Sequence, residues 1–121
     1  MLVVEDDEAV RTLTVTVLKR AGYRVLAAGG AADAVRACDA HPGPVHLVLT
    51  DVVMPGLSGR ELAEELRAKH PGLRVAFQSG YTADAVLRRG VRQDGEQFLQ
   101  KPYTAARLAQ FVRAALDAPA G

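Results

Sequence analysis

The chain has 121 residues, the size of one domain built around a single core. With 49% hydrophobic and 24% charged residues it has an ordinary globular composition, which excludes a disordered or fibrous protein. The 15 basic and 14 acidic residues give a net charge of +1, which argues against nucleic-acid binding by this chain alone. One cysteine, Cys38, excludes an internal disulfide and cannot build a zinc site without many other ligands. No apolar run approaches the roughly 20 residues that cross a bilayer, and no signal-peptide core is present, so we expect a cytoplasmic protein.

Short apolar runs alternate with longer segments of helical period along the whole chain. The apolar runs lie at 2–4, 24–27, 46–49, 74–77 and 97–99, and each is typical of a buried strand. In the first helical segment Val10, Leu13, Val17 and Leu18 share one face. Weaker patterns predict a second helix over 31–38 and a third from Gly59 through Leu66, and the segment 82–89 offers a short helix at best. The last helix has the clearest apolar face, formed by Leu108, Phe111, Val112, Ala115 and Leu116.

This alternation of five strands with five helices predicts a doubly wound α/β fold with a parallel sheet. The strand runs are continuously apolar, as expected for strands buried on both faces. Turn signals at Gly22, at 42–44 and at 70–72 agree with the predicted helix ends. We therefore expect one domain over 1–118, followed by a tail at 119–121.

Polar residues follow four of the five predicted strands, at their carboxyl ends. They are Glu5, Asp6 and Asp7 after the first strand, Asp51 after the third, Gln78 and Ser79 after the fourth, and Gln100 and Lys101 after the fifth. In an open α/β sheet ligands bind outside the carboxyl ends of the strands. The sequence therefore predicts that carboxylates, a hydroxyl and an ammonium group converge at one edge of the sheet.

Each of these residues also has a purely structural explanation. Asp6 or Asp7 is a candidate N-cap for the following helix, and Asp51 a candidate strand end before a Pro-Gly turn. Ser79 is a candidate turn residue, and Lys101 a candidate surface charge. His41, His46 and His70 are predicted at the other ends of the strands, as surface residues.

The combined set suits phosphoryl transfer. Carboxylate oxygens with open water positions favour Mg²⁺ over zinc. A carboxylate is also a nucleophile that forms an aspartyl phosphate. In that chemistry Mg²⁺, Lys101 and the Ser79 hydroxyl would neutralise the phosphoryl oxygens.

Over essentially its whole length the sequence resembles a receiver domain of the two-component response-regulator family, and it is most similar to receivers of hybrid sensor histidine kinases. The matching motifs are Val3-Val4-Glu5-Asp6, Thr50-Asp51 within 49–56, Ser79-Gly80-Tyr81-Thr82 and Phe98-Leu99-Gln100-Lys101-Pro102. The resemblance implies a flavodoxin-like fold with strand order 2-1-3-4-5. It also implies that a phosphohistidine on a histidine kinase or histidine phosphotransfer protein donates its phosphoryl group to Asp51, with self-catalysed phosphorylation and dephosphorylation.

The remaining site roles also come from the resemblance. The expected Mg²⁺ ligands are Glu5 (through a bound water), Asp6, Asp51 and the carbonyl of Val53. Ser79 and Phe98 are the expected switch residues, Lys101 is expected to pair with the phosphoryl group, and Lys101-Pro102 is expected to be a cis peptide.

Two positions depart from the common pattern, because many receivers have Asp where Glu5 stands and Thr where Ser79 stands. Asp7 offers an alternative register for the acidic pair.

Two rival functions remain. An aspartyl-phosphate phosphatase of the haloacid-dehalogenase type is disfavoured because Val53, and not an acid, follows two residues after Asp51. A pseudo-receiver that binds proteins without accepting phosphate is disfavoured because the full set of site residues is present. The sequence leaves open the cognate kinase, the output, and whether the domain stands alone or belongs to a larger kinase.

Overall fold

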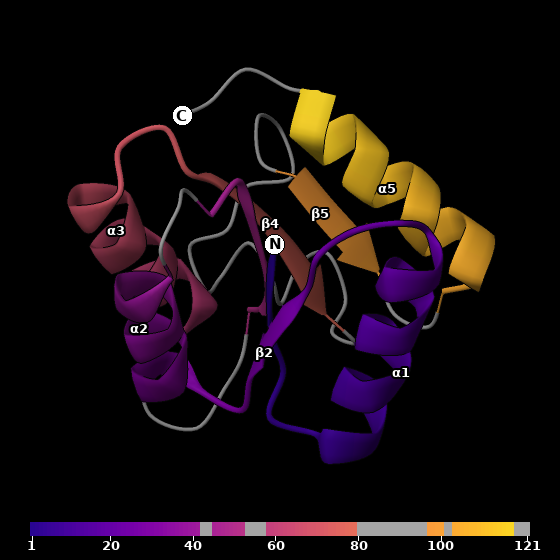
Figure 1. The fold of residues 1–121 in the computed structure, drawn as a ribbon, viewed down its shortest axis with the longest axis horizontal. Coiled ribbons are helices and arrows are strands. Elements are labelled where there is room, and N and C mark those ends of the chain that lie inside the picture. Colours follow the sequence, from indigo (N-terminus) through magenta and orange to yellow (C-terminus); the bar gives the residue numbers. More distant parts are fainter. Residues whose placement is uncertain (42–44, 53–57, 80–96, 101–102, 118–121) are drawn as a thin grey trace.

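The fold is a five-stranded parallel sheet covered by helices on both faces (Figure 1). The computed structural model describes residues 1–41, 45–52, 58–79, 97–100 and 103–117, without the side chains of Ser79, Gln97, Phe98 and Gln100. In chain order the elements are β1 (Leu2–Val4), α1 (Glu8–Arg20), β2 (Leu26–Ala28), α2 (Ala31–Ala40), β3 (Leu47–Asp51), α3 (Gly59–Lys69), β4 (Arg74–Ser79), β5 (Gln97–Gln100) and α5 (Ala105–Asp117). The strand order β2-β1-β3-β4-β5 confirms the expected topology.

The strand boundaries differ from the sequence-based ones by up to two residues. Strand β2 begins at Leu26 and not at Arg24, because Leu26 is the residue that pairs with Leu2 of β1. Strand β3 continues through Asp51, whose ladder partner is Gln78 of β4. Asp51 is therefore the last residue of its strand and not the first residue of a loop. The short helix predicted over 82–89 lies outside the described residues.

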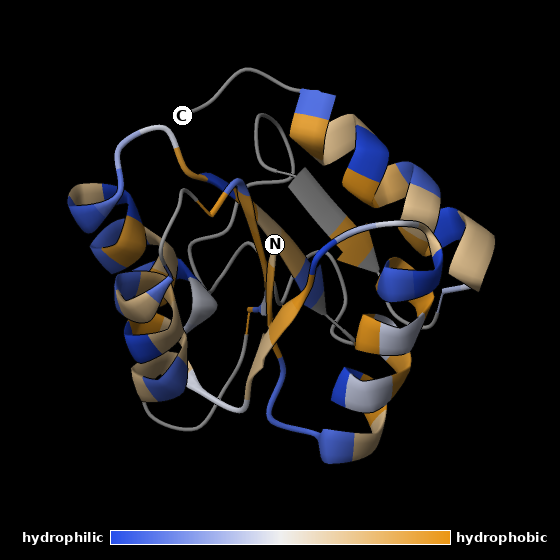
Figure 2. Ribbon diagram, in the orientation of Figure 1, coloured by the Kyte–Doolittle hydropathy of each residue, from blue (hydrophilic) through white to orange (hydrophobic). Residues whose placement is uncertain are grey.

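Two hydrophobic clusters fill the space between the sheet and its helices. Successive side chains of a strand point to opposite faces, so Leu2 and Val4 join the cluster under α2 and α3, while Val3 joins the cluster under α1 and α5. Figure 2 shows apolar colours along the central strands and hydrophilic ones on the outer sides of the helices. The double burial confirms the prediction drawn from the continuously apolar strand runs.

Helix α1 is rotated from the orientation that its apolar pattern predicts. Leu13 was expected on the buried face, but 65% of it is exposed, whereas Thr14 and Leu18 are buried. Val10, Leu13 and Val17 instead line a groove of about 270 Å³ between α1 and α5. The prediction for Leu13 is wrong because α1 packs against both the sheet and α5, and these two contacts use different sides of the helix.

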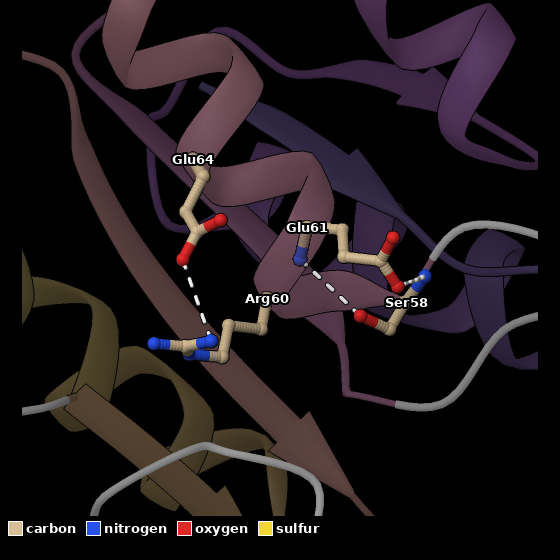
Figure 3. Close-up of polar contacts among 4 residues, drawn as sticks. All are labelled: Ser58, Arg60, Glu61 and Glu64. Atoms are coloured by element: carbon tan, nitrogen blue, oxygen red, sulfur yellow. Dashed lines mark hydrogen bonds and ion pairs between the residues drawn. The ribbon is translucent and has the colours of Figure 1, made fainter.

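Helix α3 begins with a capping box, which fixes where its first turn starts. The Ser58 hydroxyl accepts a hydrogen bond from the Glu61 amide at 3.2 Å, and the Glu61 carboxylate accepts one from the Ser58 amide at 3.4 Å (Figure 3). Arg60 and Glu64 form an exposed ion pair one turn further along. No helix in the described part of the chain is long and apolar enough to cross a membrane.

Candidate functional site

Three carboxylates from two neighbouring strands meet at the carboxyl edge of the sheet. Glu5 and Asp6 follow β1, and Asp51 ends β3. One carboxylate oxygen of each lies within 4.8 Å of the others. Glu5 is 2% exposed and Asp51 is 6% exposed, whereas Asp6 is open to solvent. We call Glu5, Asp6 and Asp51 the acidic cluster, and its assembly is what the alternation of strands and helices predicted.

The backbone around Glu5 is held by contacts from both sides. The Glu5 amide donates to the carbonyl of Ala28 at 3.1 Å, which continues the β1–β2 ladder by one step. The Glu5 carbonyl accepts a hydrogen bond from the Arg11 guanidinium at 2.8 Å. Arg11 was not singled out in the sequence, because its side chain reaches back from the first turns of α1 to this carbonyl only in the folded chain. These contacts fix the point at which the chain leaves the sheet, and thus the direction of the two carboxylates.

Asp7 does not belong to the acidic cluster. Its carboxylate accepts a hydrogen bond from the Val10 amide at 3.0 Å, which makes Asp7 the N-cap of α1. An acidic cap also suits the positive end of the helix dipole. The structural explanation is therefore correct for Asp7, and the alternative register that replaces Asp6 with Asp7 loses its support.

The backbone at Asp51 is pinned by β4 and by the start of α3. The Val52 amide donates to the Gln78 carbonyl at 3.1 Å, and the Gly59 amide donates to the Val52 carbonyl at 2.9 Å. A Cβ atom at Gly59 would lie only 2.0 Å from the Asp51 carbonyl oxygen. Only glycine allows this approach, so the first residue of α3 helps to hold the Asp51 backbone in place.

Both oxygens of the Glu5 carboxylate accept hydrogen bonds. One oxygen accepts from the Asp7 amide at 3.2 Å, and the other accepts from the side-chain amide of Gln78 at 3.3 Å. Gln78 is fully buried, and its side-chain oxygen accepts a 2.6 Å hydrogen bond from the Tyr103 hydroxyl. The sequence placed Gln78 at this edge without a role, although an amide at the end of an apolar strand run was a signal for one. Nothing in the sequence pointed to Tyr103, because its contact with Gln78 depends on how β4 and α5 pack.

The other predicted site residues are only partly described. Ser79 and Phe98 lie in β4 and β5 by their backbones, but their side chains are outside the described set. The ladder pairs Ser79 with Gln100, which places the ends of these two strands side by side. Val53, Lys101 and Pro102 lie outside the described residues.

The histidines and the cysteine lie away from the acidic cluster. His46 is exposed, and His41 and His70 are half-buried, with His70 bonded to Asp39 at 3.2 Å. Cys38 lies on the buried side of α2, and this burial raises the pKa of its thiol, so that it remains protonated at neutral pH. The acidic cluster thus offers carboxylate oxygens alone, a donor set that favours a hard cation such as Mg²⁺ over zinc.

Comparison with known families and proteins gives one consistent result. Residues 1–113 match the response regulator receiver domain family. The chain is 38% identical over 117 residues to sensor kinase CckA of Brucella abortus (strain 2308), covering 97% of this chain and 12% of that protein. It is 33% identical to the response regulator receiver protein CpdR of the same organism, covering 85% of this chain and 84% of CpdR. The chain therefore spans most of CpdR but a small part of the sensor kinase.

Solved structures agree with the sequence relatives. The receiver domain of the hybrid histidine kinase CckA superimposes with a TM-score of 0.79 at 33% identity, covering 96% of this chain and 97% of that one. A CheY-like receiver domain protein from Methanospirillum hungatei JF-1 gives a TM-score of 0.81 at 26% identity, covering 96% of this chain and 91% of that one. Both likenesses extend over nearly the whole chain.

Proposed function

This chain belongs to the response regulator receiver domain family, and we propose that it is a phosphoacceptor whose Asp51 receives a phosphoryl group from a partner phosphohistidine. The partner is a histidine kinase or a histidine phosphotransfer protein. The observation that carries the proposal is the position of Asp51: a nearly buried carboxylate at the end of β3, within 4.8 Å of two further carboxylates. Such crowding of like charges costs stability and is typical of a functional site.

Mg²⁺ fits the donor set, and we propose that Glu5, Asp6 and Asp51 hold it together with the Val53 carbonyl. When bound, the ion neutralises the negative charge of the phosphoryl oxygens during transfer. Glu5 is fixed by its hydrogen bonds to the Asp7 amide and to Gln78, so its carboxylate keeps one orientation toward Asp6 and Asp51. Asp6 is exposed, so this part of the cluster is open to solvent.

In the transfer step an Asp51 carboxylate oxygen forms a bond to phosphorus as the bond between phosphorus and the donor's imidazole nitrogen breaks. The imidazole leaves with the electron pair and takes up a proton, and Asp51 becomes an aspartyl phosphate. The hydrogen bond from the Gly59 amide to the Val52 carbonyl holds the backbone next to Asp51, so the attacking carboxylate stays beside Glu5 and Asp6. Lys101 pairs with the phosphoryl group, while Ser79 and Phe98 act as switch residues that transmit the conformational change caused by phosphorylation to the surface.

The largest effect expected of any substitution in this chain follows from Asp51→Asn, which removes the nucleophile with almost no change of shape. Treatment of the chain with acetyl phosphate and Mg²⁺, followed by mass spectrometry, should give an adduct of one HPO₃ on the unmodified sequence and none on Asp51→Asn. Asp39→Asn is the matched control, because Asp39 is an exposed aspartate outside the acidic cluster. An adduct that persists on Asp51→Asn would contradict the assignment, and the absence of any adduct on the unmodified chain would favour a pseudo-receiver.

A further inference from the structure

A continuous line of polar side chains runs from the acidic cluster to helix α1. It begins at Glu5, passes through the Gln78 amide and the Tyr103 hydroxyl, and reaches the Thr14 hydroxyl, which lies 3.3 Å from that of Tyr103. Thr14 in turn donates to the Val10 carbonyl at 2.9 Å. Gln78 is 0% and Thr14 2% exposed, so much of the line is shielded from water. These residues come from four separate parts of the chain, and we call them the polar relay.

The hydrogen-bonding capacities of the four groups fix the direction of the first two bonds. The Gln78 NH₂ group donates to a Glu5 carboxylate oxygen at 3.3 Å. The Gln78 oxygen then faces Tyr103, whose hydroxyl must donate its single proton to it. The 2.6 Å separation of the Tyr103 and Gln78 oxygens is that of a short, well-formed O–H···O bond.

We propose that Gln78 is a positioning residue for the acidic cluster, and that the Tyr103 hydroxyl sets its orientation. The inference rests on the proposed function, since it concerns how Glu5 is presented to Mg²⁺. A buried amide that loses the acceptor bond to Tyr103 is left with an unsatisfied oxygen, a state that proteins avoid. Rotating the amide by half a turn would place its oxygen against the Glu5 carboxylate and would repel it. The hydroxyl therefore keeps a donor, and not an acceptor, pointed at Glu5.

The position of Tyr103 extends this influence to the surface. Tyr103 is half-buried and, with Thr14, lines the groove between α1 and α5. Tyr103 lies two residues before α5, so its hydroxyl stands beside the groove that α1 and α5 form, and through Gln78 it affects Glu5. A change at the acidic cluster should likewise reach Tyr103, because Glu5, Gln78 and Tyr103 share one chain of hydrogen bonds.

The test is Mg²⁺ titration of the 121-residue chain, followed by NMR. In the unmodified chain, Mg²⁺ should shift the backbone signals of Glu5 and Asp6 and also the side-chain NH₂ signals of Gln78. Tyr103→Phe removes only the hydroxyl, and it should weaken Mg²⁺ binding about tenfold, the loss typical of a residue that orients a metal ligand. Tyr23→Phe is the matched control, because Tyr23 is also a half-buried tyrosine of the same hydrophobic cluster but makes no bond to Gln78 among the described contacts.

A double-mutant cycle separates positioning from general loosening of the fold. Gln78→Met keeps the length of the side chain without its amide and should weaken Mg²⁺ binding as much as Tyr103→Phe does. In the Gln78→Met background, Tyr103→Phe should then have almost no further effect on Mg²⁺ affinity, because its hydroxyl acts through the amide. Additive losses would overturn the proposal.

Unchanged Mg²⁺ affinity in Tyr103→Phe would overturn the relay and leave the proposed function intact. Failure of the unmodified chain to bind Mg²⁺ at the acidic cluster would instead overturn the metal site of the proposed function, and the positioning role with it.

Discussion

The carboxyl and amino ends of the parallel sheet differ in whether their polar groups are buried or exposed. At the carboxyl end the chain buries polar groups, namely Glu5, Thr50, Asp51 and Gln78. At the amino end it makes turns through Gly22 and Gly72, both with positive φ, and the ion pair of Lys69 with Asp39 is exposed. Buried charge has to be stabilised by specific partners, whereas exposed charge is stabilised by water. The difference indicates that the amino end maintains the fold and that the carboxyl end sacrifices stability for a site.

The close approach of α3 to Asp51 gives the sharpest test of how the carboxyl end of the sheet holds the site. Gly59→Ala would place a Cβ 2.0 Å from the Asp51 carbonyl oxygen, so either α3 or β3 must move. We expect a loss of about 3 kcal/mol or more in the free energy of unfolding, since the clash is with backbone and not with a flexible side chain. Urea unfolding measures this loss, and the shifted Asp51 should also lower the rate of phosphorylation by acetyl phosphate.

Gly30→Ala is the control for this substitution. Gly30 also lies at the carboxyl end, as the N-cap of α2, but its φ is −176° and a Cβ there would meet nothing within 4 Å. The expected loss is below about 1 kcal/mol, as for an N-cap position that gains a methyl group. Equal losses at Gly59 and Gly30 would mean that the approach to Asp51 relaxes easily and does not pin the site.

At the amino end, Gly22→Ala should affect the fold but not the site. Gly22 has a φ of 98°, which an alanine adopts only at a cost of about 1 to 2 kcal/mol. Urea unfolding should show that loss, and Gly22→Asn should lose less, because asparagine tolerates positive φ better. The stabilisation by Mg²⁺ should equal that of the unmodified chain, and a smaller value would contradict the independence of the two ends.

A substitution in the acidic cluster is expected to raise the free energy of unfolding, whereas the glycine substitutions lower it. Asp6→Asn removes one of three neighbouring negative charges, so in the presence of a chelator it should stabilise the chain by up to about 1 kcal/mol, a modest value because Asp6 is exposed. At ten times its dissociation constant, Mg²⁺ should stabilise the unmodified chain by about 1.4 kcal/mol and should stabilise Asp6→Asn much less. Urea unfolding with Mg²⁺ and with chelator measures all four stabilities.

Asp7→Asn makes the same chemical change one residue along the chain. Asparagine caps a helix about as well as aspartate, so the stability should change by a few tenths of a kcal/mol and the response to Mg²⁺ should be retained. If instead Asp7→Asn loses the Mg²⁺ response and Asp6→Asn keeps it, the acidic pair has the other register.

The sequence predicted the fold more completely than the site, for a physical reason. Burial on both faces gives each strand a continuous apolar run, so the strands and the meeting of Glu5, Asp6 and Asp51 at one edge followed from periodicity. The strand order followed from the family resemblance. The rotation of α1 that exposes Leu13 was not predictable, because apolar residues face α5 as well as the sheet.

The polar contacts that hold the site were equally hidden. Gln78 and Tyr103 are 25 residues apart, and their hydrogen bond depends on how α5 packs against the sheet. Arg11 has the spacing of an ordinary surface residue of a helix, yet its guanidinium binds the Glu5 carbonyl. A sequence pattern records which face of an element is apolar, but it does not record which single polar atoms meet across elements.

The smallest effect is expected at the amino end, where Asp39 of α2 contacts Lys69 and His70 at the end of α3. Asp39 and Lys69 are exposed and His70 is half-buried, so Asp39→Asn should cost only a few tenths of a kcal/mol, and less at high salt, because water and ions screen the charges. Urea unfolding at low and high salt measures this loss, and the Mg²⁺ response and the acetyl phosphate adduct should both remain. A loss above about 1 kcal/mol, or a weaker response to Mg²⁺, would mean that the junction of α2 and α3 communicates with the acidic cluster through the hydrophobic cluster between them. The amino end would then belong to the functional machinery, and the division between an end that maintains the fold and an end that holds the site would have to be abandoned.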